Sequence, residues 1–329
     1  KIMTALLAFE RLRDGSLSLD DELPVSEEAW RKGGSRMFVQ VGSSVKVSDL
    51  LQGIIVQSGN DASIVLAEGL AGNEPAFGNL MTERARAIGL QHTVFRNSTG
   101  WPDPDHVTTA RDMAKLAHHV IANYPELYAI YSEKEFTYGT SPNGKPITQS
   151  NRNPLLYRLA GADGLKTGHT EGAGYCLAAS AMRDGMRLIS VVMGSASETA
   201  RASESQSLLN YGFRFFETVQ LYQAGAELAV GKVWKGTVDE VSLGLAAPLF
   251  VTIPRGRYEE LDGQVELRPE LSAPLEEGTV VGSITVRLGD DLVASRDLTT
   301  LSAVEAAGFF GRTWDGLRLW ADGLFSDDE

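Results

Sequence analysis

The sequence predicts a mixed α/β (α+β) domain, in which helices flank an antiparallel sheet, followed by a small all-β domain and a terminal amphipathic helix. Three patterns predict this order: helical and strand segments alternate over the first two thirds, short strands alone follow, and an amphipathic segment ends the chain. The length of 329 residues fits roughly two domains of about 150 residues each. We place the divisions at 1–218, 219–308 and 309–329.

The first helices are predicted from apolar spacing and from residues that cap helix ends. Apolar residues from Ile2 to Phe9 recur at helical spacing, and Asp14-Gly15 predicts the end of that helix. Pro75 indicates the first turn of another helix. After a loop rich in Asn, Thr, Gly and Pro, Thr108 or Thr109 is expected to cap a further amphipathic helix.

Strand patterns appear after Pro142. Two β-rich runs, Gly174 to Met182 and Met186 to Met193, are joined through Asp184-Gly185, which predicts an antiparallel hairpin. A long helix is expected from about Ala200 to Val219, with four apolar residues on its inner side, Leu208, Leu209, Phe213 and Phe216. Short strands separated by Gly, Pro and Asp turns then predict a small β-sandwich or barrel, at Val238–Leu243, Leu249–Ile253, Gln264–Leu267, Val280–Val286 and Leu292–Ala294.

The terminal segment, 309–329, has Phe, Trp and Leu on one side, and two interpretations remain open. It is either a helix that packs on protein, or an interfacial helix that binds a membrane surface. The aromatic residues favour the membrane. The net charge of −3 over residues 312–329, from two Arg and five acidic residues, opposes it, because anionic lipid repels negative charge.

Composition excludes several classes of protein. Thirty Lys and Arg stand against 43 Asp and Glu, so the net charge of −13 argues against a nucleic-acid partner. No stretch approaches the roughly 18 unbroken apolar residues of a membrane-spanning helix. The single cysteine, Cys176, excludes an internal disulfide framework and a Cys-based zinc site, and we expect it to be a buried structural thiol. We expect neither a metal nor a cofactor.

Two tripeptides carry the chemistry: Ser58-Gly59-Asn60 and Lys166-Thr167-Gly168. Read structurally, the first is a strand-to-helix turn in which Asn60 caps the helix, and the second is the entrance to a strand. Together they match the second and third elements of the penicillin-recognising serine enzymes, whose first element is S-x-x-K. Lys1 stands where the Lys of that first element belongs, so we expect its serine three residues before Lys1, outside this chain.

Further segments resemble one family over nearly the whole chain, in order. The chain is similar to the D-alanyl-D-alanine carboxypeptidases among the low-molecular-mass penicillin-binding proteins. The resemblance implies a transpeptidase/β-lactamase-like domain followed by a β domain. Its matching segments are Lys1–Thr4, Gly53–Ala62, Ala110–Ala114, Lys166–Thr170, Arg187–Gly194, Gly212–Glu217 and Leu249–Gly256.

The resemblance implies that a serine-type carboxypeptidase removes the terminal D-Ala from the peptidoglycan pentapeptide. The reaction passes through an acyl-serine intermediate, and β-lactam antibiotics acylate the same serine. Without that serine, the 329-residue fragment is expected to be inactive. The family also implies a location on the periplasmic face of the inner membrane, peripherally held by the terminal helix, with a signal peptide upstream.

A serine hydroxyl needs a neighbouring base, and a lysine serves only if its pKa falls. Lys1 is the candidate base, and Lys166 the candidate second cation that lowers its pKa. Ser58 is expected to relay a proton to the departing amine, and the Asn60 amide to hold the peptide carbonyl of the substrate.

The remaining candidates bind the substrate. Lys166 and Thr167 would meet the terminal carboxylate, together with Arg201 at the matching position of the family pattern. The strand after Gly168, starting at His169, would offer a backbone N–H to the oxyanion hole.

Two side chains keep open readings. Arg152 lies in a polar loop, either at the site or away from it, and Trp101 either lies at the edge of the cleft or stabilises its own loop.

Two other functions remain as alternatives. A class A β-lactamase shares the three motifs but would need a deacylating Glu in an E-x-x-L-N context, which is absent, and would lack the β domain. A non-catalytic penicillin- or muropeptide-binding protein is the third hypothesis.

Overall fold

The computed structural model describes residues 1–308, so the expected terminal helix at 309–329 lies outside the described residues. The chain divides into two compact units, Lys1–Arg214 and a second unit that begins at Phe215. Each unit has a hydrophobic core of its own. In the described residues, no helix is both long enough and apolar enough to cross a membrane.

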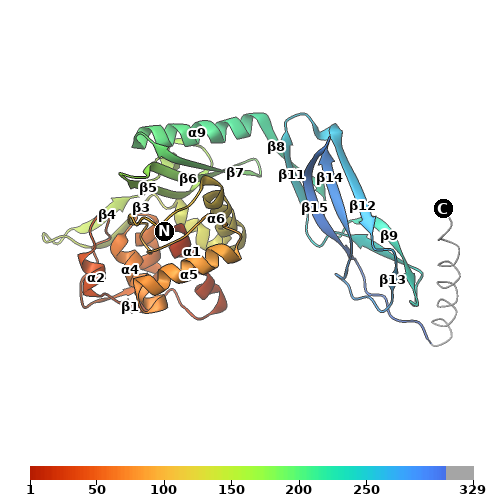
Figure 1. Ribbon diagram of the computed structural model, residues 1–329, viewed down its shortest axis with the longest axis horizontal. Helices are drawn as coiled ribbons and strands as arrows, with labels where there is room; N and C mark the ends of the chain where they lie inside the picture. Colours follow the sequence, from red (N-terminus) through yellow and green to blue (C-terminus); the bar gives the residue numbers. More distant parts are fainter. Residues whose placement is uncertain (309–329) are drawn as a thin grey trace. The chain divides into compact units, whose positions relative to one another are not determined.

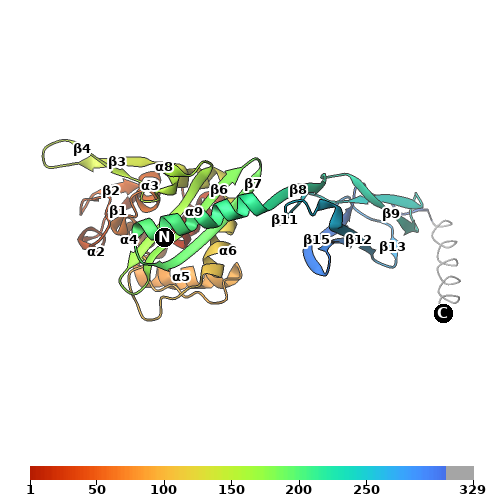
Figure 2. The same ribbon diagram turned by 90° about the horizontal axis from the view of Figure 1, so that it is seen from above.

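The first unit is an antiparallel sheet between two layers of helix (Figure 1 and Figure 2). Its strands lie in the order β5 (Ala162–Thr170), β6 (Gly174–Arg183) and β7 (Met186–Ser195). Successive side chains of a strand point to opposite faces. Leu177 therefore packs with Leu209 of α9 (Glu198–Phe215) on one face. Ala178 joins the main core on the other face, where α6 (Ala110–Asn123) and the other helices lie.

The predicted helix boundaries are confirmed where a capping residue marks them. Helix α1 ends at Asp14, and Gly15 adopts a left-handed φ of 78°. Pro75 lies in the first turn of α5, and the Thr109 side chain caps α6 by accepting a hydrogen bond from the Asp112 amide. The other elements of this unit are α1 (Ile2–Asp14), α2 (Glu27–Arg31), α3 (Val47–Ile55), α4 (Asn60–Ala71), α5 (Glu74–Ala87), α7 (Pro125–Tyr128), η1 (Ala129–Ser132), α8 (Leu155–Arg158), β1 (Glu22–Pro24), β2 (Ser44–Lys46), β3 (Glu135–Thr140) and β4 (Pro146–Ser150).

The strand-to-helix reading of Ser58-Gly59-Asn60 is wrong. The apolar run before it belongs to helix α3, so the tripeptide joins two helices, α3 and α4. The buried residues Val47, Leu50, Leu51, Ile54 and Ile55 follow helical spacing, and the partly exposed Ser48, Asp49 and Gln52 form the opposite face, so the sequence does contain the pattern of this helix. Asn60 does not cap α4 either: the N-cap is Gly59, and no side chain accepts a bond there. Its amide is used elsewhere, as described below.

The hairpin is confirmed, whereas the helix after it is shorter than expected. Asp184 and Gly185 have φ values of 48° and 80°, the left-handed pair of a type I′ turn between β6 and β7. Helix α9 ends at Phe215 rather than near Val219, because the next residues pair with β11 as a strand. Of the residues expected to face inward, Leu209 lies in the core, whereas Leu208 is 52% exposed.

The second unit is a β structure, as predicted. Its larger sheet runs β12-β14-β15-β10-β9-β13, and β8 pairs with β11 in a smaller sheet. Buried Leu243, Val251, Ile284 and Leu298 belong to the core of this unit. The sequence missed β8, β9 and β13. The elements are β8 (Phe216–Tyr222), β9 (Glu227–Trp234), β10 (Glu240–Gly244), β11 (Leu249–Pro254), η2 (Tyr258–Glu260), β12 (Leu261–Leu267), β13 (Leu271–Ser272), β14 (Val280–Leu288) and β15 (Asp291–Thr300).

Candidate active site

Lys1 lies at the start of α1 and joins two loops that are distant in sequence. Its Nζ donates hydrogen bonds to Oδ1 of Asn60 at 2.7 Å and to the carbonyl of Thr99 at 2.6 Å. Burial of this ammonium is the main cause that lowers the pKa of Lys1 from 10.5 to about 7, and the charge of Arg152 is the next. A lysine with a pKa near neutrality is partly an amine, so it can accept a proton.

A second cation besides Lys166 acts on Lys1. Arg152 has the largest charge effect on the pKa of Lys1. The two lysines also disfavour each other's charge, and the pKa of Lys166 falls well below its usual value through burial first and the charge of Lys1 next. Arg152 and Arg201 lower it further. Five basic groups therefore interact around this site: Lys1, Lys32, Arg152, Lys166 and Arg201.

In the Ser58-Gly59-Asn60 turn, Ser58 is marked by its backbone conformation and Asn60 by its contact with Lys1. Ser58 has a φ of 60°, a left-handed conformation rare for a residue other than glycine and often found at functional sites. The Asn60 amide group donates to the carbonyl of Gly33 at 2.9 Å and accepts from Lys1. The structure thus brings Asn60 into direct contact with Lys1, whereas the hydrogen bonds of Lys1 do not include Ser58.

The second tripeptide lies on β5, an edge strand of the sheet. Lys166 and Thr167 are buried, and Nζ of Lys166 donates to the Thr167 carbonyl at 3.2 Å. Lys1, Lys166, Thr167 and Gly168 line one cavity of about 170 Å³. Cys176 lines it too and is only partly buried, so the expectation of a fully buried thiol is wrong. It faces the cavity because it pairs with Gly168, which has no side chain to cover it.

Arg201 and His169 both lie against one aromatic ring, that of Tyr175. The His169 ring stacks on Tyr175 with centroids 4.0 Å apart, and the Arg201 guanidinium lies 5.5 Å from the same ring. Arg201 is 4% exposed, and its Nη1 donates to the Gly168 carbonyl at 3.1 Å. The one carboxylate paired with it within residues 1–308, that of Glu198, is exposed and 3.5 Å away. The guanidinium therefore lies beside the tripeptide with a weak counter-ion.

Arg152 is held at the site by its neighbours, which the sequence did not reveal. Asn151 donates to the Glu133 carbonyl and accepts from the Asn153 amide, and Asn153 donates to the Gly164 carbonyl at 2.8 Å. Both Asn side chains are buried, while Arg152 between them is exposed. Buried amides that satisfy backbone groups fix a loop rigidly. The signal available in the sequence was the Asn-Arg-Asn alternation itself.

A second layer fixes the loops that Lys1 touches. The buried Glu74 carboxylate accepts from the backbone and the hydroxyl of Ser98, directly before Thr99. The buried Asp61 carboxylate accepts from the backbone N–H groups of residues 37–39, at 3.0, 2.8 and 3.3 Å. Neither acid was singled out from the sequence, because a lone Asp or Glu in a helical pattern carries no distinctive signal.

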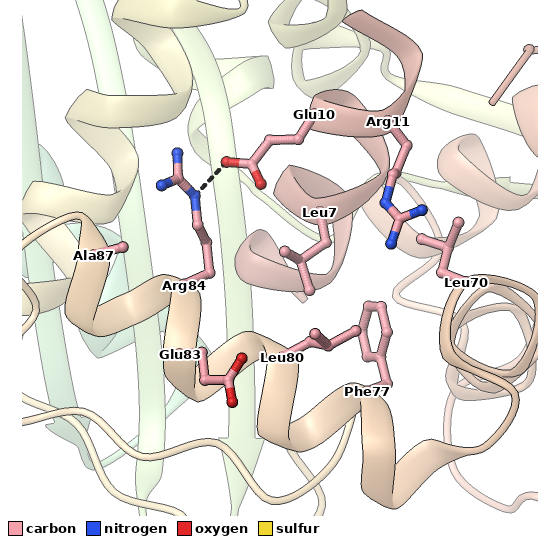
Figure 3. A pocket seen from close by; sticks show the side chains of 9 residues that line it. All are labelled: Leu7, Glu10, Arg11, Leu70, Phe77, Leu80, Glu83, Arg84 and Ala87. Carbon is pink, nitrogen blue, oxygen red and sulfur yellow. Dashed lines mark hydrogen bonds and ion pairs between the residues drawn. The ribbon is translucent and has the colours of Figure 1, made fainter. Parts of the chain in front are cut away.

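A larger hollow, of about 340 Å³, lies apart from these residues between α1, α4 and α5 (Figure 3). Leu7, Leu70, Phe77 and Leu80 supply its apolar side chains, and an ion pair between Glu10 and Arg84 crosses its edge. It contains none of the candidate site residues. We place the site at the smaller cavity, where the lysines converge. Within residues 1–308, no group of three or more His, Cys, Asp or Glu side chains could hold a metal ion.

Comparison with known proteins agrees with this geometry. Residues 1–197 match the family described as D-alanyl-D-alanine carboxypeptidase, and residues 216–306 match the family described as penicillin-binding protein 5, C-terminal domain. The chain is 43% identical to the D-alanyl-D-alanine carboxypeptidase DacC of Escherichia coli K12, over 99% of this chain and 83% of that protein. It is 41% identical to DacA of Haemophilus influenzae, over 99% and 83% respectively.

A solved structure, penicillin binding protein 5 of Haemophilus influenzae, is similar with a TM-score of 0.82 and 40% identity, covering 92% of this chain and 88% of that one. The presence of the β domain excludes the class A β-lactamase alternative, which would lack it. The chain belongs to the D-alanyl-D-alanine carboxypeptidases of the low-molecular-mass penicillin-binding proteins, enzymes of peptidoglycan metabolism that bind β-lactams.

Proposed function

We propose that this protein acts through an acyl-serine intermediate, with Lys1 as the general base. The nucleophile is a serine three residues before Lys1, one helical turn away on the same face. The observation that carries the proposal is the Lys1 amine: it is enclosed, it contacts Asn60, and its pKa is about 7. A base with such a pKa is ready to take the serine proton at neutral pH.

In each half of the reaction, one proton leaves the attacking O–H group and one proton is given to the leaving group. Lys1 takes the hydroxyl proton as the serine oxygen bonds to the carbonyl carbon between the two D-Ala residues. The tetrahedral oxyanion accepts hydrogen bonds, one of them from the backbone N–H of His169 on β5, an edge strand of the sheet. The C–N bond then breaks, and Ser58 passes the proton from Lys1 to the departing amine, so that D-Ala leaves and Lys1 is neutral again. Lys1 next takes a proton from water as the water oxygen bonds to the acyl carbon, and it returns this proton to the serine oxygen as the ester bond breaks.

Substrate orientation follows from the charges. The terminal carboxylate binds at Arg201, Lys166 and Thr167, because Arg201 is almost buried and weakly paired and Arg suits a carboxylate fork. A bound carboxylate favours the protonated form of Lys166. The amide nitrogen of Asn60 carries two hydrogens. One of them is hydrogen-bonded to the Gly33 carbonyl, so the other can donate to the substrate carbonyl. The protein carries a net charge of −13, so this anionic substrate is attracted by local groups alone.

The proposal is tested by measuring free D-Ala released from a pentapeptide, using the enzyme expressed from its complete gene. Ser58→Ala should lower kcat by about 10²–10⁴-fold, the usual value of a positioned acid. Lys166→Ala should abolish release. Release that is unchanged in both variants would contradict the roles given to these side chains.

We further propose a periplasmic enzyme whose residues 309–329 bind the surface of the inner membrane. The support is the amphipathic aromatic pattern of that segment together with the family. Flotation with liposomes should carry the full chain to the top of a gradient and leave a chain ending at residue 308 behind. Equal flotation of both would favour the packing alternative.

A further inference from the structure

A solvent-exposed aromatic side chain, that of Trp101, lies at the edge of the candidate active site beside Asn60. A Cβ atom built on Gly34 would lie 2.8 Å from Nδ2 of Asn60 and 3.2 Å from Cζ3 of Trp101, so the two side chains meet over this glycine. Trp101 nevertheless keeps 45% of its surface exposed. Leaving part of an indole in water forgoes hydrophobic free energy that a bound apolar group would recover.

The backbone that carries Trp101 belongs to the loop that also binds Lys1. The backbone N–H of Trp101 donates to Oδ1 of Asn97 at 2.9 Å and to Oγ1 of Thr99 at 3.1 Å, and its carbonyl accepts from Nδ2 of Asn97 at 2.9 Å. The carbonyl of Thr99 accepts from Lys1. The backbone of residue 101 is therefore fixed relative to the reacting centre, which a residue that determines specificity requires.

A cation lies over this ring without a carboxylate partner. The Lys32 ammonium is 5.3 Å from the Trp101 ring centroid, and Lys32 is partly buried. In the part of the chain that the structure describes, its ammonium forms no ion pair with any Asp or Glu. Its charge reaches Lys1, where it contributes to the lowered pKa. Lys32 and Trp101 together thus offer an apolar surface that ends in a positive charge.

We propose that Lys32 and Trp101 bind the side chain of the substrate residue that precedes D-Ala-D-Ala, and that this side chain is an aliphatic stem ending in a carboxylate. The inference rests on the proposed function, which fixes the direction of the peptide. The terminal carboxylate lies at Arg201 and the reacting carbonyl at Lys1, so the preceding residue passes Asn60 and reaches Trp101. The stem packs on the indole and its carboxylate pairs with Lys32, in the pattern of amphipathic side chains generally.

The test compares two peptides that differ in one charge: N-acetyl-L-α-aminoadipyl-D-Ala-D-Ala and the same peptide with a side-chain carboxamide. Dissociation constants are measured calorimetrically on the 329-residue chain, and kcat/KM on the enzyme expressed from its complete gene. The carboxylate peptide should be preferred about fivefold in both, the size of a favourable partly exposed ion pair. Lys32→Gln should bring both ratios close to one. Trp101→Leu should weaken binding of both peptides.

The ratio between the carboxylate and the carboxamide peptide is the decisive quantity. Loss of the Lys32 charge also alters the pKa of Lys1, and this changes the turnover of both peptides equally. Lys232→Gln is the matched control: its ammonium lies 3.8 Å from the ring centroid of Trp234 in the second unit, and it should keep the native preference. Equal ratios in Lys32→Gln and the native protein would overturn the proposal. If peptides bind with the expected ratio but release no D-Ala, the proposed function fails and the binding site stands.

Discussion

The role of Arg152 can be tested through the pH dependence of catalysis. In Arg152→Gln the largest charge that lowers the pKa of Lys1 is lost. A unit charge acting through protein and water is worth about 1–2 kcal/mol, or about one pKa unit. The pKa of Lys1 should therefore rise from about 7 to about 8. Since the base must be neutral, the active fraction at pH 7 falls from about one half to about one tenth.

The expected result is a fivefold loss of kcat/KM at pH 7 that disappears by about pH 9. D-Ala release is measured between pH 5.5 and 9.5, and Arg152→Lys serves as the control because it keeps the charge. Activity rises with pH in every variant, and only the midpoint moves. A uniform loss at all pH values would refute the reasoning and place Arg152 in substrate binding, and an unchanged profile would remove it from the site.

Two further predictions concern stability. Asp61→Asn places an amide where four backbone N–H groups, three of them from residues 37–39, donate to a carboxylate, so the free energy of unfolding measured in urea should fall by about 2–3 kcal/mol; a loss below about 0.5 kcal/mol would show that the loop is held by other contacts. Gly161→Ala places a methyl group against the Met182 carbonyl at a φ of 81°. It should lower Tm more than Gly144→Ala, whose φ is 75° with open space around the Cβ position, and equal losses would mean that the conformation alone matters.

The sequence predicted those elements whose ends are marked by local chemistry. Gly15, Thr109 and the Asp184-Gly185 pair each act on their own backbone, so they could be recognised without the tertiary structure. Helix α3 was missed although its apolar residues follow helical spacing, because the short apolar run 53–56 directly before Ser58 is equally typical of a buried strand. The end of α9 was missed because pairing between β8 and β11 decides it, and that partner is more than 30 residues away.

The candidate site also contains residues that the sequence could predict and residues that only the structure reveals. Its motif residues could be named in advance, and the contact between Lys1 and Asn60 agrees with them. The cap expected of Asn60 failed, because Gly59 is the N-cap residue and Oδ1 of Asn60, the atom that would accept a capping bond, accepts from Lys1 instead. The influence of Arg152 on Lys1 depends on burial, and Lys32 matters only because the fold lays it over Trp101. Electrostatic coupling of this kind has no sequence spacing and needs the structure.

The central claim is that Lys1 activates a serine one helical turn before it. Benzylpenicillin acylates the nucleophile of such an enzyme, so intact-mass spectrometry followed by peptide mapping of the protein expressed from its complete gene tests the claim directly. We predict one covalent adduct, located on a serine three residues before Lys1 and lost when that serine is changed to Ala. An adduct on Ser58 would contradict the account. A residue other than serine three positions before Lys1 would contradict it as well.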